Sequence, residues 1–293
     1  MPRRVFRASV ALVVLAAACG CGAPPAQSAL GYSENAKHAY EEALEQFNAH
    51  NWIEAQTLLR EVKRKYSYSK YARMAELRIA DADLEQDKQP DAIREYKDFI
   101  RAHPADEDNV AYARSRIAEA SFSEIPESFL APAPEEREQG SVVDAYKELK
   151  SYLSDYPSSK QSAHIRDLLE RVTQLLVRHE LYVARFYLGK GNYDAAVARV
   201  EYALRTYGSS EPVADTIPPG APGGAMDAGS ATGASASPAL MADALLLLGE
   251  TYLQMHKWRD ARQAFQAVIQ SERQGPSTIE AQHYLEFLRK KGV

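Results

Sequence analysis

The sequence predicts an all-α protein: a solenoid of about five helical hairpins that ends in a C-terminal capping helix. One pattern recurs five times, an alanine followed by a bulky residue four positions later and an apolar or small residue seven positions later. Spacings of four and seven place these three residues on one face of a helix. A turn-type residue lies twelve positions after each of the first four alanines, which predicts where those helices end. The five alanines are Ala55, Ala92, Ala145, Ala196 and Ala261.

This pattern resembles the tetratricopeptide repeat, in which a small residue lets the second helix of a hairpin approach its neighbour closely. Five copies favour a solenoid over the alternative, an irregular helical bundle whose alanines align by chance. The intervals between the alanines are 37, 53, 51 and 65 residues, whereas a plain repeat has about 34. The longer intervals therefore predict inserted segments.

The first 18 residues are predicted to be a secretory signal. They read MPRRVFRASVALVVLAAA and combine a basic start, an apolar run and small residues. The run is too short to cross a bilayer, which takes about 20 residues. The four residues before Cys19 and that cysteine resemble a bacterial lipobox, which implies cleavage before Cys19 and attachment of lipid to it. Cys21 is a second candidate, and a plain secretory signal with two incidental cysteines is the alternative.

The remaining chain divides into a tether, a repeat region and a C-terminal unit. We expect a flexible tether over 19–35, repeats 1–4 over 36–208 with an insertion at 121–140, and a fifth repeat with its capping helix over 239–293. Between them, 209–238 consists mostly of Gly, Ala, Pro and Ser, which predicts a disordered loop. The stretch 162–189 contains no loop signals, so its extra residues are expected to lengthen a helix.

Charge and cysteine content exclude several function classes. Lys plus Arg number 35 and Asp plus Glu number 40, a net charge of −5, which argues against a nucleic-acid-binding surface over the whole protein and leaves local basic patches open. The only cysteines are Cys19 and Cys21. The folded body therefore has no disulfide, no zinc-cysteine site and no cysteine nucleophile.

Catalytic motifs are not recognisable in the chain. His179-Glu180 begins like a zinc-protease helix, but position 183 is Val, so a second histidine ligand is missing. Ser67-Tyr68-Ser69-Lys70 matches an S-x-x-K pattern, yet no S-D-N or K-T-G follows it, and it is better explained as a turn between repeats. We therefore expect a protein that is not an enzyme and has no cofactor or metal.

Three segments together resemble the BamD family, the lipoprotein subunits of the outer-membrane β-barrel assembly machinery. They are 39–71, 96–113 and 179–208, of which the last, HELYVARFYLGKGNYDAAVARVEYALRTYG, is the most specific. The resemblance implies a lipid-anchored scaffold on the periplasmic face of the outer membrane. It implies three kinds of partner: the periplasmic domains of a BamA-type barrel subunit, other lipoproteins of the machinery, and unfolded outer-membrane proteins. Gly20, where Asp would favour retention in the inner membrane, agrees with that location.

The resemblance also assigns two groups of residues. Tyr66, Tyr68 and Tyr71 at the first repeat turn would form a pocket for substrate or lipoprotein, with packing between repeats as the alternative role. A second group on the side that faces the BamA-type subunit comprises Glu180, Arg199, Glu201 and Tyr202. Arg199 follows the repeat spacing onto a face that reaches solvent, so a solvated charge is its alternative role.

Two further functions remain open from the residues alone. One is a periplasmic tetratricopeptide lipoprotein that coordinates cell-wall or envelope enzymes. The other is a lipid-anchored enzyme regulator without catalytic residues of its own. A concave repeat surface suits all three functions because it can hold peptides or domains.

Overall fold

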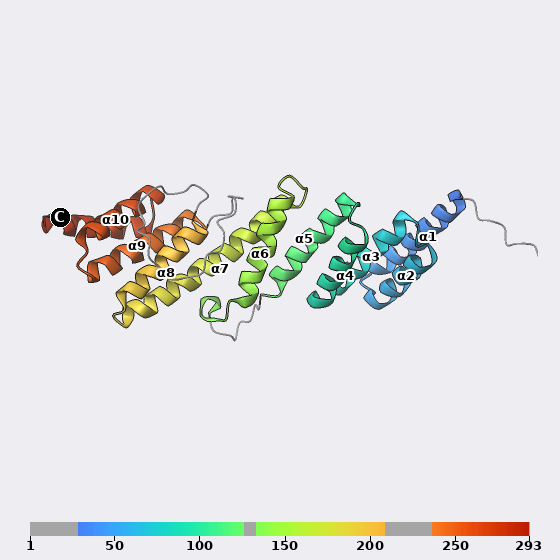
Figure 1. Ribbon diagram of the computed structural model, residues 1–293, viewed down its shortest axis with the longest axis horizontal. Coiled ribbons are helices and arrows are strands. Elements are labelled where there is room, and N and C mark those ends of the chain that lie inside the picture. The colour runs from blue at the N-terminus through green and yellow to red at the C-terminus, as the bar shows by residue number, and fades with distance from the viewer. Residues whose placement is uncertain (1–28, 126–132, 209–235, 293) are drawn as a thin grey trace, which may run out of the picture.

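The computed structural model describes residues 29–125, 133–208 and 236–292, and these ranges contain eleven α-helices, one 3₁₀ segment and no strand. The helices follow one another along an elongated molecule, with α1 at one end and α11 at the other (Figure 1). The predicted all-α solenoid is thus confirmed. The elements are α1 (Ala29–Asn48), α2 (Trp52–Lys65), α3 (Lys70–Leu84), α4 (Gln89–Ala102), α5 (Glu107–Ser123), η1 (Pro134–Glu136), α6 (Gly140–Asp155), α7 (Ser162–Gly189), α8 (Tyr193–Tyr207), α9 (Pro238–Gln254), α10 (Trp258–Ser271) and α11 (Pro276–Lys290).

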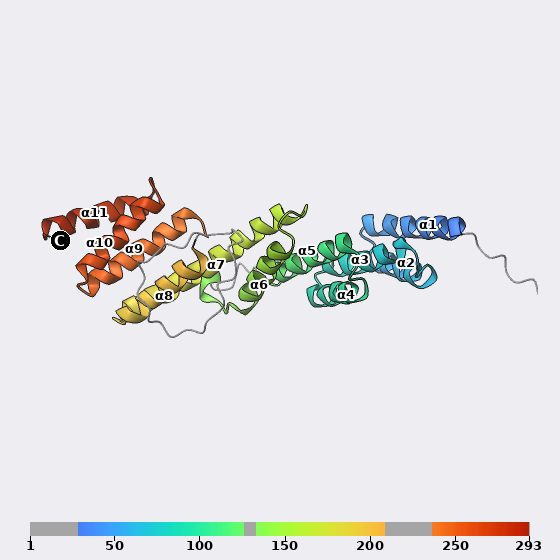
Figure 2. The ribbon, with the colours of Figure 1, turned by 45° about the horizontal axis from the view of Figure 1, so that its top comes forward.

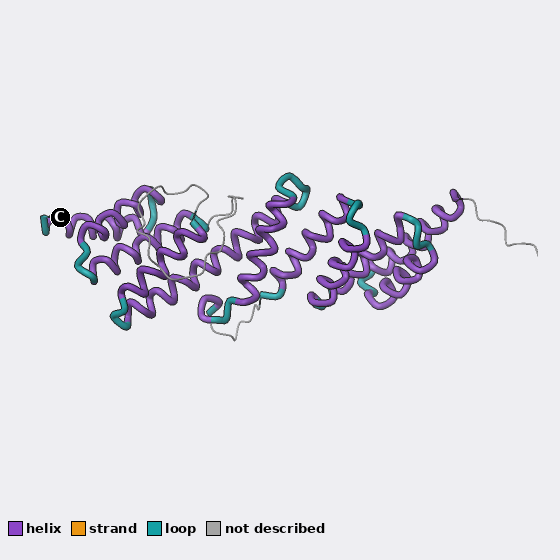
Figure 3. The backbone as a smooth tube through the Cα atoms, in the orientation of Figure 1, coloured by secondary structure: helices purple, strands orange, loops and turns teal. Residues whose placement is uncertain are grey.

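The helices form two layers. Each helix packs against the next one in the chain, and the odd-numbered helices also contact one another from α1 through to α11. The even-numbered helices make no such contacts among the described residues. The odd-numbered helices therefore form a continuous layer. The even-numbered helices form a second layer, in which each helix of the described ranges contacts odd-numbered helices and not its even-numbered neighbours (Figure 2). Short loops join most of the successive helices (Figure 3).

The recurring alanines pack where the helices approach most closely. All five have no exposed surface, and the bulky residue four positions after each of them is also fully buried. A methyl group at the crossing leaves room for the larger side chain of the neighbouring helix, which is the ridge-and-groove packing that holds a helical solenoid together. The buried partners are Leu59, Tyr96, Leu149, Val200 and Phe265.

Several boundaries differ from those expected. Residues 29–35, assigned above to the tether, are the first turns of α1, and Tyr32 packs against the core of the first repeat. The end of the predicted loop 209–238 is also structured: Ala236 is buried, and the Ser237 hydroxyl accepts a hydrogen bond from Leu240 N, which caps α9. The sequence pattern placed the starts of α1 and α9 too late, because the residues there pack on neighbouring helices, which a local pattern does not show.

The insertion at 121–140 is partly helical. Its first residues extend α5 to Ser123, and η1 packs against α7, where His179 Nδ1 lies 2.7 Å from the Glu135 carbonyl oxygen. Residues 126–132 lie outside the described residues. The extra length at 162–189 is a single helix, α7, of 28 residues. No helix in the described ranges is long and apolar enough to cross a membrane.

Candidate docking surfaces

The surface formed by α7 and α8 holds Arg199 in an internal ion pair. Arg199 Nη1 donates to Glu180 Oε2 at 3.2 Å, and Glu180 is buried on α7. The Arg199 side chain keeps 45% of its surface exposed. A buried carboxylate is stable only when it is paired. Arg199 therefore neutralises Glu180 and at the same time presents part of its guanidinium group to solvent.

The other two residues of the predicted group point in different directions. Glu201 Oε1 accepts a hydrogen bond from Tyr252 Oη at 3.0 Å, which ties α8 to α9. Burial and the nearby Glu201 carboxylate raise the pKa of Tyr252. Tyr202 is exposed, and its ring packs edge-on against Tyr207. The structure thus brings together Arg199 and Glu180, turns Glu201 towards α9 and leaves Tyr202 on the surface.

Two exposed aromatic residues on α7 were missed by the sequence analysis. Tyr182 and Phe186 both lie on the exposed face of the helix, four residues apart, so they are neighbours on that face. Lys190 Nζ lies 5.6 Å from the centre of the Phe186 ring. Their spacing of four residues is visible in the sequence. The same spacing also occurs in residues that face the core, so the sequence alone does not show that this pair is exposed.

The three tyrosines at the first repeat turn do not line one open pocket. Tyr66 is only 6% exposed and packs edge-on against Tyr32, with 5.4 Å between ring centres. Tyr71 is half-buried against Tyr40. Tyr68 is 94% exposed. Tyr66 and Tyr71 thus pack against rings on α1, and Tyr68 is the most exposed of the three.

A buried polar network, also unforeseen, joins α3, α4 and α5. The Asp81 carboxylate is 2% exposed and accepts from Tyr112 Oη at 2.9 Å, from Tyr96 Oη and from Arg78, with Arg116 Nε 3.4 Å away. Burial, with the nearby Asp81 charge second, raises the pKa of Tyr112 to about 12. Two cations around one carboxylate make this network a rigid link between the first repeats.

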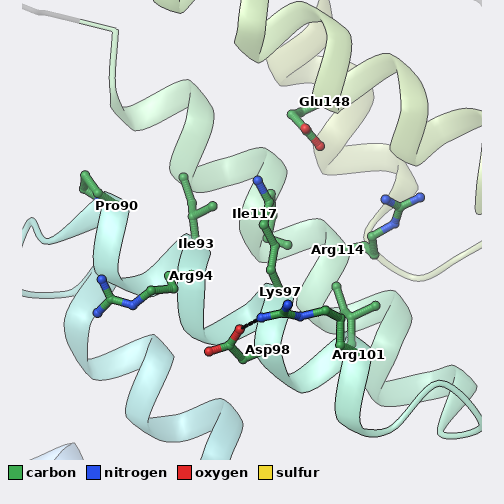
Figure 4. A pocket seen from close by; sticks show the side chains of 10 residues that line it. Pro90, Ile93, Arg94, Lys97, Asp98, Arg101, Arg114, Ile117 and Glu148 are labelled. Carbon is green, nitrogen blue, oxygen red and sulfur yellow. Dashed lines mark hydrogen bonds and ion pairs between the residues drawn. The ribbon is translucent and has the colours of Figure 1, made fainter.

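A shallow groove of about 590 Å³ lies over α5, between α4 and α6 (Figure 4). Its apolar floor includes Ile93 and Ile117, and cationic side chains surround it. Arg94 pairs with Asp91 and Arg101 with Asp98, so acidic neighbours on α4 offset much of that positive charge. Among the residues that the structure describes, no group of three or more His, Cys, Asp and Glu side chains is placed to hold a metal ion.

Comparison with known proteins assigns the family. The sequence model of a family described as outer membrane lipoprotein (YfiO) matches residues 33–218, which is more than half of the chain and includes both predicted groups of residues. The chain belongs to this family. A tetratricopeptide repeat model matches residues 243–273, from α9 to just past the end of α10. Together with the relatives described next, which are named BamD, this match confirms the resemblance to the BamD family.

Relatives of this YfiO-family chain include three proteins named outer membrane protein assembly factor BamD. The protein from Xylella fastidiosa is 25% identical over 178 residues, which cover 59% of this chain and 60% of the relative. That from Neisseria meningitidis serogroup A is 26% identical, covering 61% and 67%. That from Caulobacter vibrioides is 25% identical, covering 67% and 62%. The chain thus spans about three fifths of the length of the Xylella relative.

Among solved structures, the TPR2AB domain of yeast Sti1 in its pHSP90 complex aligns with a TM-score of 0.45 and 11% identity. The alignment covers 88% of this chain and 84% of that one.

Proposed function

We propose that this protein is an outer membrane protein assembly factor: a non-catalytic, lipid-anchored scaffold at the periplasmic face of the outer membrane. The observation that carries the proposal is the family match over 33–218, which runs from α1 to beyond the end of α8. Relatives that carry the assembly-factor name support it. The two-layered solenoid fits such a role because a stack of helical hairpins offers extended surface to partner domains and segments.

The docking surface proposed for a BamA-type barrel subunit lies on α7 and α8. Arg199 would bind a carboxylate of the subunit's periplasmic domain with the part of its guanidinium group that faces solvent. Its contact with Glu180 fixes the side chain beforehand, which lowers the entropy lost on binding. Tyr202, on the same helix as Arg199, supplies exposed ring surface of the kind enriched at protein interfaces.

The proposal extends to the other partners that the family resemblance implies. These are further lipoproteins of the assembly machinery and unfolded outer-membrane proteins. Tyr68 is the most exposed member of the predicted N-terminal pocket.

Copurification from detergent-solubilised membranes tests the assignment. A β-barrel membrane protein with periplasmic domains should copurify with the wild-type chain. Arg199→Glu should reduce its recovery at least tenfold, because the variant places a carboxylate beside Glu180 and opposite the partner's acid. Arg205→Glu is the matched control, an exposed arginine on another face of the same helix.

The outcomes separate the docking surface from the function. Recovery of the barrel protein with both variants would overturn the α7–α8 surface and leave the assembly role standing. Recovery of cell-wall enzymes in place of a barrel protein would overturn the assembly role itself. Circular dichroism of Arg199→Glu distinguishes a lost contact from unfolding, because the variant leaves the buried Glu180 without its partner.

A further inference from the structure

The end of the solenoid at which the chain enters α1 carries exposed apolar, aromatic and basic side chains. We call this surface the N-terminal tip and define it by Leu30, Arg64, Lys65, Tyr68 and Lys70. Leu30 is 79% exposed and Tyr68 is 94% exposed, and all three basic residues are exposed. The contact between Tyr32 and Tyr66 shows that the start of α1 lies beside the end of α2, so these residues share one end of the molecule.

The tip is basic in an acidic protein. Residues 62–72 (VKRKYSYSKYA) contain four cations and no acid, whereas the whole chain has a net charge of −5. Lys63 lies 3.7 Å from Glu76, but the contacts of Lys65 and Lys70 are with the faces of the Tyr66 and Tyr71 rings. Both lysine side chains are exposed, so each ammonium group can bind an anion while it lies above its ring.

Helix stability explains only part of this composition. Lys63, Arg64 and Lys65 occupy the last turn of α2, where cations complement the helix dipole. Lys70 is the first residue of α3, and that helix has no acid in its first turn. A cation at a helix N-terminus is unfavourable. The charge of Lys70 stabilises neither helix and the Tyr68 ring packs on neither, so both side chains are available to a partner outside the chain.

The place of the tip suggests which partner this is. Nine residues, 20–28, separate Cys19 from Ala29, and a fully extended chain of that length reaches about 35 Å. A lipid on Cys19 would therefore keep the start of α1 within about 35 Å of the bilayer. At that distance the tip is the end of the solenoid nearest to the membrane.

We propose that the N-terminal tip is a membrane-contact surface that binds an anionic phospholipid bilayer. Tyr68 and Leu30 enter the headgroup region, where tyrosine is favoured because its ring is apolar and its hydroxyl is polar. Arg64, Lys65 and Lys70 bind the phosphates. This inference rests on the lipid anchor of the proposed function. The contact would set the direction in which the solenoid leaves the membrane and so orient the α7–α8 surface.

Vesicle binding tests the tip without the anchor. The chain from residue 19 onward, with Cys19→Ser and Cys21→Ser, is sedimented with vesicles of phosphatidylethanolamine and phosphatidylglycerol at 3:1, and with phosphatidylcholine vesicles. We expect binding to the anionic vesicles, weakened by 0.5 M salt. Lys65→Glu/Lys70→Glu should lower the affinity at least about tenfold. Lys290→Glu/Lys291→Glu, at the other end of the solenoid, is the control for charge.

A second pair of variants isolates the aromatic contribution. Tyr68→Ser should weaken binding to the anionic vesicles several-fold. Ile53→Ser should not, although Ile53 is 78% exposed, because it lies at the opposite end of α2. Both positions are on the surface, so neither change is expected to unfold the chain.

Each outcome supports or overturns the inference. No binding of the unlipidated chain to anionic vesicles, or equal loss in tip and control variants, overturns it. The tip variants could instead bind vesicles as the wild type does and lose a copurified protein. The tip would then be a protein interface, which also overturns the membrane-contact inference. Failure of the anchor appears in a different assay, the membrane retention of the Cys19→Ser full-length chain, so the two failures are distinguishable.

Discussion

Single residues show how strongly the neighbouring helices determine the role of a side chain. Arg199 follows the sequence pattern to a surface position, yet its closest charged partner is Glu180 in the same chain. Tyr66 and Tyr68 are two positions apart, and one is core while the other is almost entirely exposed. For Arg199 and Tyr66 the decisive factor is a residue on another helix, at a sequence distance that local patterns do not reach.

The Asp81 network should be a main source of stability in the first repeats. Asp81→Ala leaves Arg78 and Arg116 without their buried carboxylate, so we expect a loss of about 3 kcal/mol or more in the free energy of unfolding. Asp98→Ala removes an exposed pair with Arg101 and should change it by no more than about 0.5 kcal/mol. Denaturant unfolding measures both variants. A loss below 1 kcal/mol for Asp81→Ala would show that the network contributes little.

Tyr66→Ala is expected to destabilise the fold. Removing a buried aromatic side chain that packs against Tyr32 costs about 3 kcal/mol. Tyr68→Ala should stay within about 0.5 kcal/mol of wild type because its ring is in solvent. Thermal unfolding followed by circular dichroism compares the two. If Tyr66→Ala melts at the wild-type temperature, the side chain is not a core residue and a pocket at this turn becomes possible again.

At the scale of elements, the corners after α1, α3, α7 and α9 share one backbone conformation. In each of these corners, one residue after the odd-numbered helix has φ between 57° and 73°; these residues are His50, Asp87, Gly191 and His256. A residue in the left-handed conformation ends the helix and turns the chain towards the even-numbered helix that follows. Three of these corners accept the cost of a non-glycine residue in this conformation. The repeat is therefore defined by its turn geometry as well as by its alanine.

The corner after α7 allows a matched test of this conformation. Gly191 has φ of 73°, and a Cβ there would meet no other atom, so Gly191→Ala should cost about 1 kcal/mol through backbone strain alone. Gly189 is the last residue of α7 and is equally uncrowded, so Gly189→Ala should raise the stability by up to about 1 kcal/mol. Urea denaturation of the two variants should give shifts of opposite sign. Shifts of the same sign would contradict the assigned geometry.

The ends of the segment between α8 and α9 lie next to each other. Ala236 N donates to the Tyr207 carbonyl oxygen at 3.2 Å, so a short linker can bridge the gap. Replacing 209–235 with six Gly and Ser residues should leave the melting temperature nearly unchanged, because shorter loops cost less entropy to close. Ser237→Ala removes the cap of α9 and should cost about 1 kcal/mol. Thermal denaturation checks both, and a fall of more than a few degrees for the linker variant would show that 209–235 contributes to the core.

At the scale of the whole molecule, α7 connects the two halves of the solenoid. It packs against α5, α6 and η1 on one side and against α8 and α9 on the other. Its buried residues run from Ser162 to Ala184, so one rigid helix belongs to the cores of both halves. A surface carried by α7 and α8 is thereby held in a fixed relation to the N-terminal repeats, which suits a scaffold that connects a membrane anchor to a partner.

Membrane attachment should depend on one cysteine. Cys19→Ser removes the predicted lipid site, and the charge-based contact of the N-terminal tip with phosphates is screened in high salt. We expect the variant in the soluble fraction after a high-salt wash, while Cys21→Ser stays with the membranes. Immunoblots of fractionated cells measure the distribution. Retention of Cys19→Ser would place the lipid elsewhere, with Cys21 as the first alternative.

The sequence by itself determined the number and period of the helices, because the Ala, +4 and +7 pattern requires one buried face per helix at 3.6 residues per turn. It also located most turns, since Gly, Pro and polar residues end a helix or form a turn through local backbone effects, within a few residues of their own position. Only the tertiary structure decided that Asp81 meets two arginines, that Arg199 meets Glu180, and that Tyr68 is far more exposed than Tyr66. A helical pattern tells which face is buried, but the residue met on that face comes from a helix many residues away, and its distance and angle are set by the packing of the whole solenoid.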